Sequence, residues 1–260
     1  MMVVPLRKHG NCSASIMEGP GLVILKEQAA KFTGKKITAA YGAQKINMDR
    51  LIGQQVTDIL TWGKHLLIVL EDCTIRIHYL MFGNYYLDSR HPEKVPKLAL
   101  EFPNGEWNNY NCAAKILEGT DMASLYDWTT DVMHPDWNAV NAVKKLKATP
   151  GQLVCDAVLN QELFTGAGNV IKNEVLFRIK VHPDSTAGAL KPGQLKRLVA
   201  EVRAYSFEFY QWEKEGVRRK KYCVHRRAWC PDCKTRLTKE FTGLTPRSSF
   251  YCSHCQPLYT

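Results

Sequence analysis

Two closely spaced pairs of cysteines near the end of the chain constrain its fold more than any other feature. Cys230 and Cys233 are separated by two residues, as are Cys252 and Cys255, and eighteen residues lie between the pairs. Two such pairs at this separation are typical of a tetrahedral zinc site with four thiolate ligands. A redox Cys-x-x-Cys site is the functional alternative, but two of them within 26 residues argue against it. We therefore expect one structural Zn²⁺ ion in a zinc ribbon, with a short hairpin between two knuckles.

The other cysteines indicate a reducing environment, and the apolar pattern argues against a membrane span and a secretory signal. Five single cysteines are scattered between Cys12 and Cys223, which fits free thiols better than a disulfide framework. No apolar run approaches the roughly 20 residues that span a bilayer. Near the start, Arg7, Lys8 and His9 interrupt the only apolar run, which argues against a secretory signal. We expect an intracellular protein, cytoplasmic or nucleoid-associated, with no membrane partner.

Positive charge is concentrated in the last part of the chain. The net charge is +10, from 35 Lys and Arg against 25 Asp and Glu, and residues 191–260 hold +9 of it. Six basic residues stand shortly before the first cysteine pair: Arg218, Arg219, Lys220, Lys221, Arg226 and Arg227. By charge alone, this excess fits a nucleic-acid contact and a solvated surface equally well. Its place beside a zinc ribbon favours nucleic acid.

Periodicity divides the rest of the chain into a β-rich half and a helical half. An amphipathic helix is expected over residues 22–32, before segments rich in Val, Ile, Leu and Thr. The predicted strands are residues 55–60, 65–70, 74–80, 98–103 and 106–110, and Leu117 is expected to close the last strand of this half. An Asn104-Gly105 turn is expected to join residues 98–103 to residues 106–110. The predicted helices are residues 138–147, 152–161, 170–178 and 192–213. This order favours a sandwich or barrel domain followed by a helical domain.

Three further segments hold residues that chemistry could use, although each has a structural explanation. Gly166-Ala167-Gly168-Asn169 precedes a predicted helix, so it fits either a phosphate-binding turn or an interhelical turn capped by Asn169. Glu18 stands in a rigid Gly-Pro turn before the first helix, which by itself is an ordinary helix entry. Lys64 lies between two apolar strands, where a lysine is usually just solvated. The residues alone leave these alternatives open.

The order and spacing of five short segments match the motifs of a known family. They are Met17-Glu18-Gly19-Pro20, Gly63-Lys64-His65-Leu66-Leu67, His78-Tyr79-Leu80-Met81-Phe82-Gly83, Gly166-Ala167-Gly168-Asn169 and Arg247-Ser248-Ser249-Phe250-Tyr251-Cys252. Each motif alone is weak, but five in register between Met17 and Gln256 are specific. The chain resembles the formamidopyrimidine-DNA glycosylase and endonuclease VIII family of DNA base-excision repair enzymes.

The resemblance implies an α+β fold with DNA bound between its two main parts. An N-terminal β-sandwich catalytic domain with a leading helix would span residues 17–130. A C-terminal helical domain with a helix–two-turn–helix motif would span residues 131–221, and a zinc-ribbon finger residues 222–260. Residues 1–16 would be an N-terminal extension.

The resemblance also implies a bifunctional enzyme, a DNA N-glycosylase and abasic-site lyase that removes oxidised bases. The damaged base would be flipped out of the duplex, and an N-terminal amine would attack the sugar and form a Schiff base. The implied catalytic residues are Met17 as nucleophile, Glu18 as general acid and Lys64 as a phosphate ligand. The implied DNA-binding residues are Met81 as a wedge, Lys115 as a contact to the orphaned base, and Asn169 and Arg247 as phosphate ligands.

Two segments depart from the family pattern. The family's nucleophile is usually a proline after the removed initiator methionine, whereas here Met17 takes that place behind sixteen residues. We expect translation to start at Met17, or the extension to be trimmed, because an amide nitrogen cannot form a Schiff base. In the family's void-filling loop, expected here at residues 112–116, Lys115 and Ile116 stand for an arginine and a phenylalanine.

We expect damaged DNA as the partner, no small-molecule cofactor, and a monomer. The alternative is a catalytically inactive DNA-binding protein that retains the glycosylase scaffold. A zinc-ribbon RNA-binding protein would explain the C-terminus, but not Glu18, Lys64 and Asn169 in register.

Overall fold

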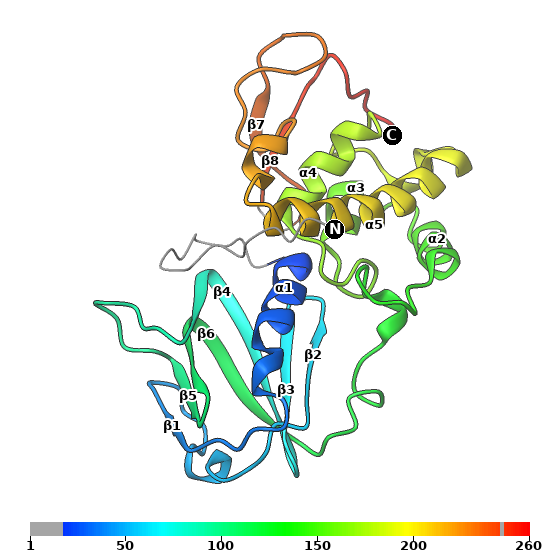
Figure 1. Cartoon of the computed structure of the whole chain (residues 1–260). Helices are drawn as coiled ribbons and strands as arrows, with labels where there is room; N and C mark the ends of the chain where they lie inside the picture. Colours follow the sequence, from blue (N-terminus) through cyan, green and yellow to red (C-terminus); the bar gives the residue numbers. More distant parts are fainter. Residues whose placement is uncertain (1–17, 245–246) are drawn as a thin grey trace, which may run out of the picture.

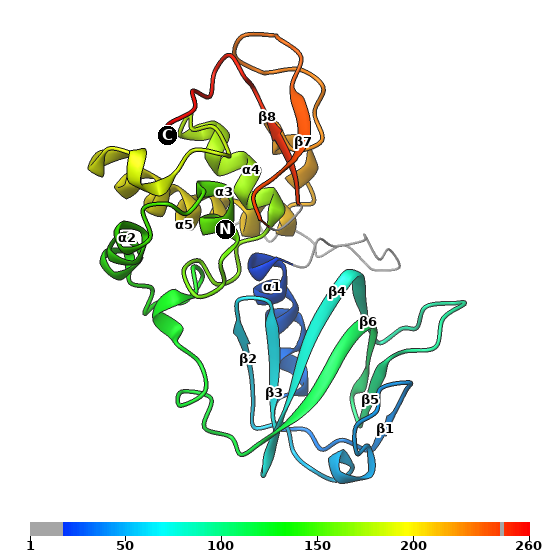
Figure 2. The same ribbon diagram turned by 180° about the vertical axis from the view of Figure 1, so that it is seen from behind.

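The computed structural model describes residues 18–244 and 247–260, so Met17 and the extension at residues 1–16 lie outside the described residues. A sheet with one leading helix forms one part of the molecule, and four helices with a C-terminal hairpin form the other (Figures 1 and 2). Together with the cysteine cluster in that hairpin, this arrangement confirms the expected fold class. In the described part of the chain, no helix combines the length and apolarity needed to cross a membrane.

The sheet is antiparallel and has six strands in the order β1-β5-β6-β4-β3-β2. The strands are β1 (Ala39–Tyr41), β2 (Asp58–Trp62), β3 (His65–Val69), β4 (Cys73–Leu87), β5 (Leu98–Phe102) and β6 (Gly105–Glu118). The long strands β4 and β6 run through both halves of the sheet, and their register shifts between Tyr79 and Asn84. Leu66 and Ile75 of one half share a core with Leu100 and Trp107 of the other. The two layers of the expected sandwich are therefore halves of one continuous sheet.

Three strand predictions near the hairpin need correction. The two-residue turn is Pro103-Asn104 and not Asn104-Gly105, because Gly105 pairs with Phe102. Strand β6 continues past Tyr110 to Glu118, next to Leu117, where the last strand was expected to close, because its second half pairs with the first half of β4. The loop expected at residues 112–116 is therefore regular strand. Strand β1, three residues long, was not predicted because it is too short to show a period.

Five α-helices complete the fold. They are α1 (Gly19–Ala29), α2 (Ala139–Ala148), α3 (Val154–Leu159), α4 (Asn169–Arg178) and α5 (Pro192–Lys214). Helix α1 covers the sheet, burying Leu22 and Leu25 in the sheet core (Figure 1). Its outer side meets α5, where Glu27 pairs with Lys214 at 2.9 Å and accepts a hydrogen bond from Tyr210. Helix α1 therefore links the two parts of the molecule.

Candidate active site

Three glycines from distant segments meet backbone to backbone between the two parts of the molecule. Gly19 begins α1, Gly63 lies in the β2–β3 turn, and Gly166 precedes α4. The Gly19 amide donates a hydrogen bond to the Gly166 carbonyl at 2.9 Å. A Cβ atom would lie 2.9 Å from the Gly166 Cα if placed on Gly19, and 2.7 Å from the Gly166 nitrogen if placed on Gly63. No side chain fits there, so these three glycines let the segments that flank them approach one another.

Glu18 lies at this junction and is 3% exposed. It is the N-cap residue of α1, but its side chain does not cap that helix. Instead, its carboxylate accepts hydrogen bonds from the backbone amides of Val170 at 2.9 Å and Ile171 at 3.4 Å, in the first turn of α4. Burial raises the pKa of Glu18, and the Lys64 ammonium and the two amide hydrogen bonds offset part of that rise. A buried carboxyl with a raised pKa is suited to holding a proton for transfer.

Lys64 is held near Glu18 by the turn between β2 and β3. Its side chain is half-buried, and burial lowers its pKa; the Glu18 carboxylate raises that pKa and Arg247 lowers it. The buried Asp131 fixes this turn, because its carboxylate accepts hydrogen bonds from the amides of Gly63 at 2.8 Å and Met133 at 2.9 Å. Sequence reasoning missed Asp131, which stands in an irregular segment without a motif.

Helix α4 fastens the C-terminal hairpin, whose strands are β7 (Thr238–Thr242) and β8 (Arg247–Tyr251). Asn169 donates a hydrogen bond from Nδ2 to the Ser248 carbonyl at 3.0 Å. The buried Lys172 donates from Nζ to Ser249 Oγ at 2.7 Å, and burial lowers the pKa of Lys172 to about 8. These contacts place the exposed Arg247, at the start of β8, close enough to Lys64 to affect its pKa. Glu18, Lys64, Asn169 and Arg247 are thus brought together.

A buried carboxylate of α4 positions the segment that leads into the hairpin. Glu174 accepts hydrogen bonds from three successive amides, those of Cys223 at 2.7 Å, Val224 at 2.9 Å and His225 at 2.7 Å. A buried carboxylate that accepts several amide hydrogen bonds is well satisfied and fixes the backbone that donates them. Helix α4 therefore positions the hairpin from both sides.

The four paired cysteines converge at the base of this hairpin. The sulfur atoms of Cys230, Cys233, Cys252 and Cys255 all lie within 4.8 Å of one another. Cys230 and Cys255 are 3.9 Å apart at Sγ, and Cys233 and Cys252 are 3.4 Å apart. A tetrahedral zinc site with 2.3 Å Zn–S bonds has sulfur–sulfur edges of about 3.8 Å, so the donor set and its spacing fit zinc. A zinc ion held by all four thiolates would have no open ligand position, as is typical of structural zinc sites.

The basic residues before the first cysteine pair do not all face solvent. Arg218 is 4% exposed, pairs with Glu213 at 3.1 Å and lies over the Phe209 ring. Arg227 donates to the backbone carbonyls of Arg219 at 2.6 Å and Tyr222 at 3.1 Å. Arg218 is therefore buried and is not available for a contact with nucleic acid. The cations left exposed without such a structural role are Arg219, Lys220, Lys221 and Arg226.

The two remaining predicted DNA-binding residues lie on the sheet. Met81 is 66% exposed and lies in the segment of β4 between Tyr79 and Asn84 where the register with β6 shifts, here called the β4 bulge. It belongs to the same end of the sheet as Lys64, because a ring nitrogen of His78 lies 3.1 Å from the Lys64 carbonyl oxygen. Lys115 is exposed but stands within β6, in register with Arg76 of β4. Lys115 therefore lies on a regular strand and not, as was expected, on a loop.

Comparison with known proteins identifies the family. Residues 21–116 match the family model of the formamidopyrimidine-DNA glycosylase N-terminal domain, and residues 128–218 match that of the formamidopyrimidine-DNA glycosylase H2TH domain. The two matches cover both parts of the molecule. The chain belongs to the formamidopyrimidine-DNA glycosylase and endonuclease VIII family.

Relatives of this glycosylase-family chain come from animals and bacteria. Endonuclease 8-like 3 of Mus musculus is 28% identical over 78% of the chain and 35% of its own length. Formamidopyrimidine-DNA glycosylase of Aliivibrio fischeri (strain MJ11) is 27% identical over 80% of the chain and 84% of its own length. The chain thus spans about a third of the mouse relative.

Solved structures share the fold at low sequence identity. The Lactococcus lactis formamidopyrimidine-DNA glycosylase, bound to DNA with an abasic site, matches with a TM-score of 0.81 at 20% identity, over 92% of the chain and 99% of that protein. A viral DNA glycosylase matches with a TM-score of 0.79 at 18% identity, over 92% of the chain and 100% of that protein.

Replacing Gly168 by alanine should displace the Glu18 side chain. A Cβ atom there would lie 2.4 Å from the Glu18 Cδ, so the carboxyl must move away from α4. We expect the free energy of unfolding to fall by about 1–3 kcal/mol, as in other overpacked sites. Gly193→Ala is the matched control, because no atom lies within 4 Å of its added Cβ. Chemical denaturation measures both variants, and equal stability for the two would contradict the packing described for Glu18.

Proposed function

We propose that this protein is a base-excision repair DNA glycosylase that removes oxidised bases and cleaves the resulting abasic site. The observation that supports this most is the glycine junction, which brings Glu18 and Lys64 to the start of α4, the helix that holds the hairpin of Arg247. The bacterial relative is named as a DNA glycosylase and the mouse relative as an endonuclease, which agrees with base removal and with strand cleavage. In this proposal the partner is damaged DNA, and the working unit is a monomer without a small-molecule cofactor.

The nucleophile in this proposal is the α-amine of Met17, the chain neighbour of Glu18. Its neutral form attacks C1′ of the flipped nucleotide and breaks the glycosidic bond, and the base leaves with a proton. The departing base takes up one of the two amine protons, and the C1′–O4′ bond of the sugar then breaks as its oxygen is protonated. The product is an iminium between C1′ and the Met17 nitrogen, which keeps its second proton. The iminium acidifies the C2′ protons, and loss of one of them expels the 3′ phosphate and cuts the strand.

Glu18 is the general acid of this scheme and protonates the sugar ring oxygen as the ring opens. Its burial favours the protonated form, and its two amide contacts keep the carboxyl oriented. Lys64 binds a phosphate beside the lesion, and Asn169 and Arg247 bind the flanking phosphates. We also assign the wedge to Met81, which is exposed and apolar. The zinc-bound hairpin holds Arg247 in place and takes no part in the chemistry.

Borohydride trapping on DNA with an abasic site tests the proposal. Protein that begins at Met17 should form a covalent adduct, because free α-amines ordinarily titrate at about pH 7.7–8.0 and are partly neutral at physiological pH. Protein that retains residues 1–16 should form at least about a hundred-fold less, because its Met17 nitrogen is an amide. Denaturing electrophoresis measures the adduct.

Protein that begins at Met17 but has an acetylated terminus is the matched control, because acetylation removes the amine and leaves every side chain intact. Equal trapping with and without the acetyl group would mean that a lysine, and not Met17, is the nucleophile. No adduct from the Met17 protein despite DNA binding would favour the alternative, a catalytically inactive DNA-binding protein.

A further inference from the structure

The β4 bulge presents an exposed aromatic side chain in a strained backbone conformation. Phe82 is 76% exposed and has φ of 64°, a region that bulky side chains rarely adopt. Its neighbour Met81 is 66% exposed, and the side chain of Asn111, itself at φ of 52°, donates to the Met81 carbonyl at 3.0 Å. Strain of this kind at an exposed apolar residue points to a function other than folding.

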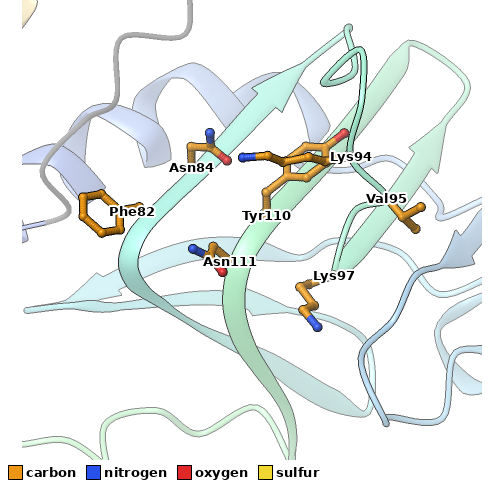
Figure 3. A pocket seen from close by; sticks show the side chains of 7 residues that line it. All are labelled: Phe82, Asn84, Lys94, Val95, Lys97, Tyr110 and Asn111. Atoms are coloured by element: carbon orange, nitrogen blue, oxygen red, sulfur yellow. The ribbon is translucent and has the colours of Figure 1, made fainter.

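A pocket of about 370 Å³ opens beside this bulge. It is lined by Phe82, Asn84, Lys94, Val95, Lys97, Tyr110 and Asn111 (Figure 3). Lys94 and Lys97 belong to the connection between β4 and β5, and in Figure 3 the Lys94 amine points toward Asn84. Both lysines are exposed, and neither forms an ion pair with any residue that the structure describes. The lining contains no carboxylate.

The chemistry of this lining suits a nucleotide. An exposed aromatic face stacks on a nucleobase, and this contact tolerates any base. Unpaired lysines bind phosphate, and amide side chains hydrogen-bond to base edges. The pocket volume lies within the range of small-ligand sites, at about 300–1,000 Å³.

The position of the pocket in the sheet indicates which nucleotide it meets. Lys64 lies in the turn that joins β2 and β3, Met81 lies on β4, and the pocket lies toward β6 and β5. Across the sheet, the Met81 wedge therefore stands between Lys64 and the pocket. If Lys64 contacts the strand that holds the lesion, the pocket lies on the side of the complementary strand.

The structure of residues 112–116 also points to a contact between Phe82 and the complementary strand. A loop there was expected to fill the space left by the flipped base, but that segment is regular β6. Phe82 extends from the neighbouring strand and is the most exposed aromatic side chain of the sheet. It is therefore the side chain placed to replace that loop.

We propose that this pocket binds a nucleotide of the DNA strand opposite the lesion, with Phe82 stacked on its base and Lys94 and Lys97 on its phosphates. The assignment to the opposite strand rests on the proposed glycosylase function, which defines the lesion strand. The pocket thus extends the binding surface to both strands of a duplex.

Binding to a duplex with an abasic-site analogue, and to its lesion strand alone, tests the pocket. Phe82→Ala should weaken duplex affinity by about ten-fold, so the ratio of duplex to single-strand affinity falls. Phe82→Trp should keep the duplex affinity near wild type, whereas Phe82→Leu, which keeps the bulk without the flat ring, should weaken it as Phe82→Ala does. Lys94→Ala with Lys97→Ala should reduce the slope of log affinity against log salt by about 1.8 on the duplex. Lys144→Ala with Lys147→Ala, two exposed lysines of α2, is the matched control and should leave both quantities unchanged.

Photo-crosslinking identifies the strand without relying on catalysis. The probe is 5-iodouracil placed either opposite the abasic-site analogue or beside it on the lesion strand. We expect a crosslink to Phe82 from the opposite strand, and loss of that crosslink in Phe82→Leu. A crosslink to Phe82 from the lesion strand alone would overturn the assignment, as would duplex affinity unchanged in Phe82→Ala. A chain that fails borohydride trapping but gives the opposite-strand crosslink would refute the glycosylase proposal while supporting the pocket.

Discussion

Glu18→Gln should reduce base removal by about a hundred- to ten-thousand-fold while leaving DNA affinity within a few-fold of wild type. Loss of a positioned general acid typically costs this much. The fold should survive, because the glutamine carbonyl can still accept the Val170 hydrogen bond that holds the side chain against α4. Single-turnover release of an oxidised base measures the first quantity, and fluorescence anisotropy with an abasic-site analogue measures the second.

Glu27→Gln is the matched control, because it makes the same carboxyl-to-amide change on the outer side of α1. It should leave base release nearly unchanged, since the glutamine carbonyl can keep the Tyr210 hydrogen bond and only the exposed ion pair with Lys214 is lost. Base release that is equal in Glu18→Gln and wild type would refute the acid role. An equal fall in base release and DNA affinity would instead mean that Glu18 is structural.

The pH dependence gives Glu18 a second signature. The acid is active when protonated, and burial raises its pKa, so base release should persist to higher pH than an exposed glutamate would allow. Release should then fall as the pH rises through that raised pKa. In Glu18→Gln, this alkaline limb should disappear from the pH profile of the residual activity.

Cys233→Ser should release the zinc ion and weaken DNA binding by about ten-fold or more. Metal binding to a four-cysteine site contributes on the order of 10 kcal/mol to folding of such small units, and one lost thiolate removes much of it. The hairpin that holds Arg247 then loses its base, although α4 still contacts β8. Zinc content by atomic absorption and DNA affinity by anisotropy measure the two effects.

Cys223→Ser is the control for this experiment, because Cys223 lies near the hairpin but outside the four-sulfur cluster. It should retain one zinc ion per chain and near wild-type DNA affinity. Full zinc content in Cys233→Ser would contradict the four-thiolate site. Zinc loss with unchanged DNA affinity would show that the hairpin does not position a DNA contact.

Local patterns in the sequence predicted most of the helices and strands. The cysteine pairs predicted the metal site because two residues between ligands set their distance in any fold. A continuous apolar run predicted β3, alternating apolar residues predicted the first half of β4, and the Gly-Pro turn marked the start of α1. Family motifs then nominated Glu18, Lys64, Asn169 and Arg247 before any contact between them was known.

The burial of individual charges was beyond such patterns. Arg218 looked like its neighbours in a basic run, but it is buried against Phe209 and Glu213. Lys115 looked like a loop residue, but its segment extends β6 because β4 supplies a partner strand. Composition counts charges, whereas the packing of distant segments decides which of them reach solvent.

The sequence by itself predicted the cluster of four cysteines and the order of strands and helices, and it nominated the residues for catalysis. Only the tertiary structure decided that the Glu18 carboxylate meets the first turn of α4, 152 residues away, and that Asp131 holds the turn of Lys64. The physical reason is the distance along the chain over which each interaction acts. Ligand spacing and apolar periods act within a few residues, whereas this site depends on three glycine backbones that touch only after both parts of the molecule have folded.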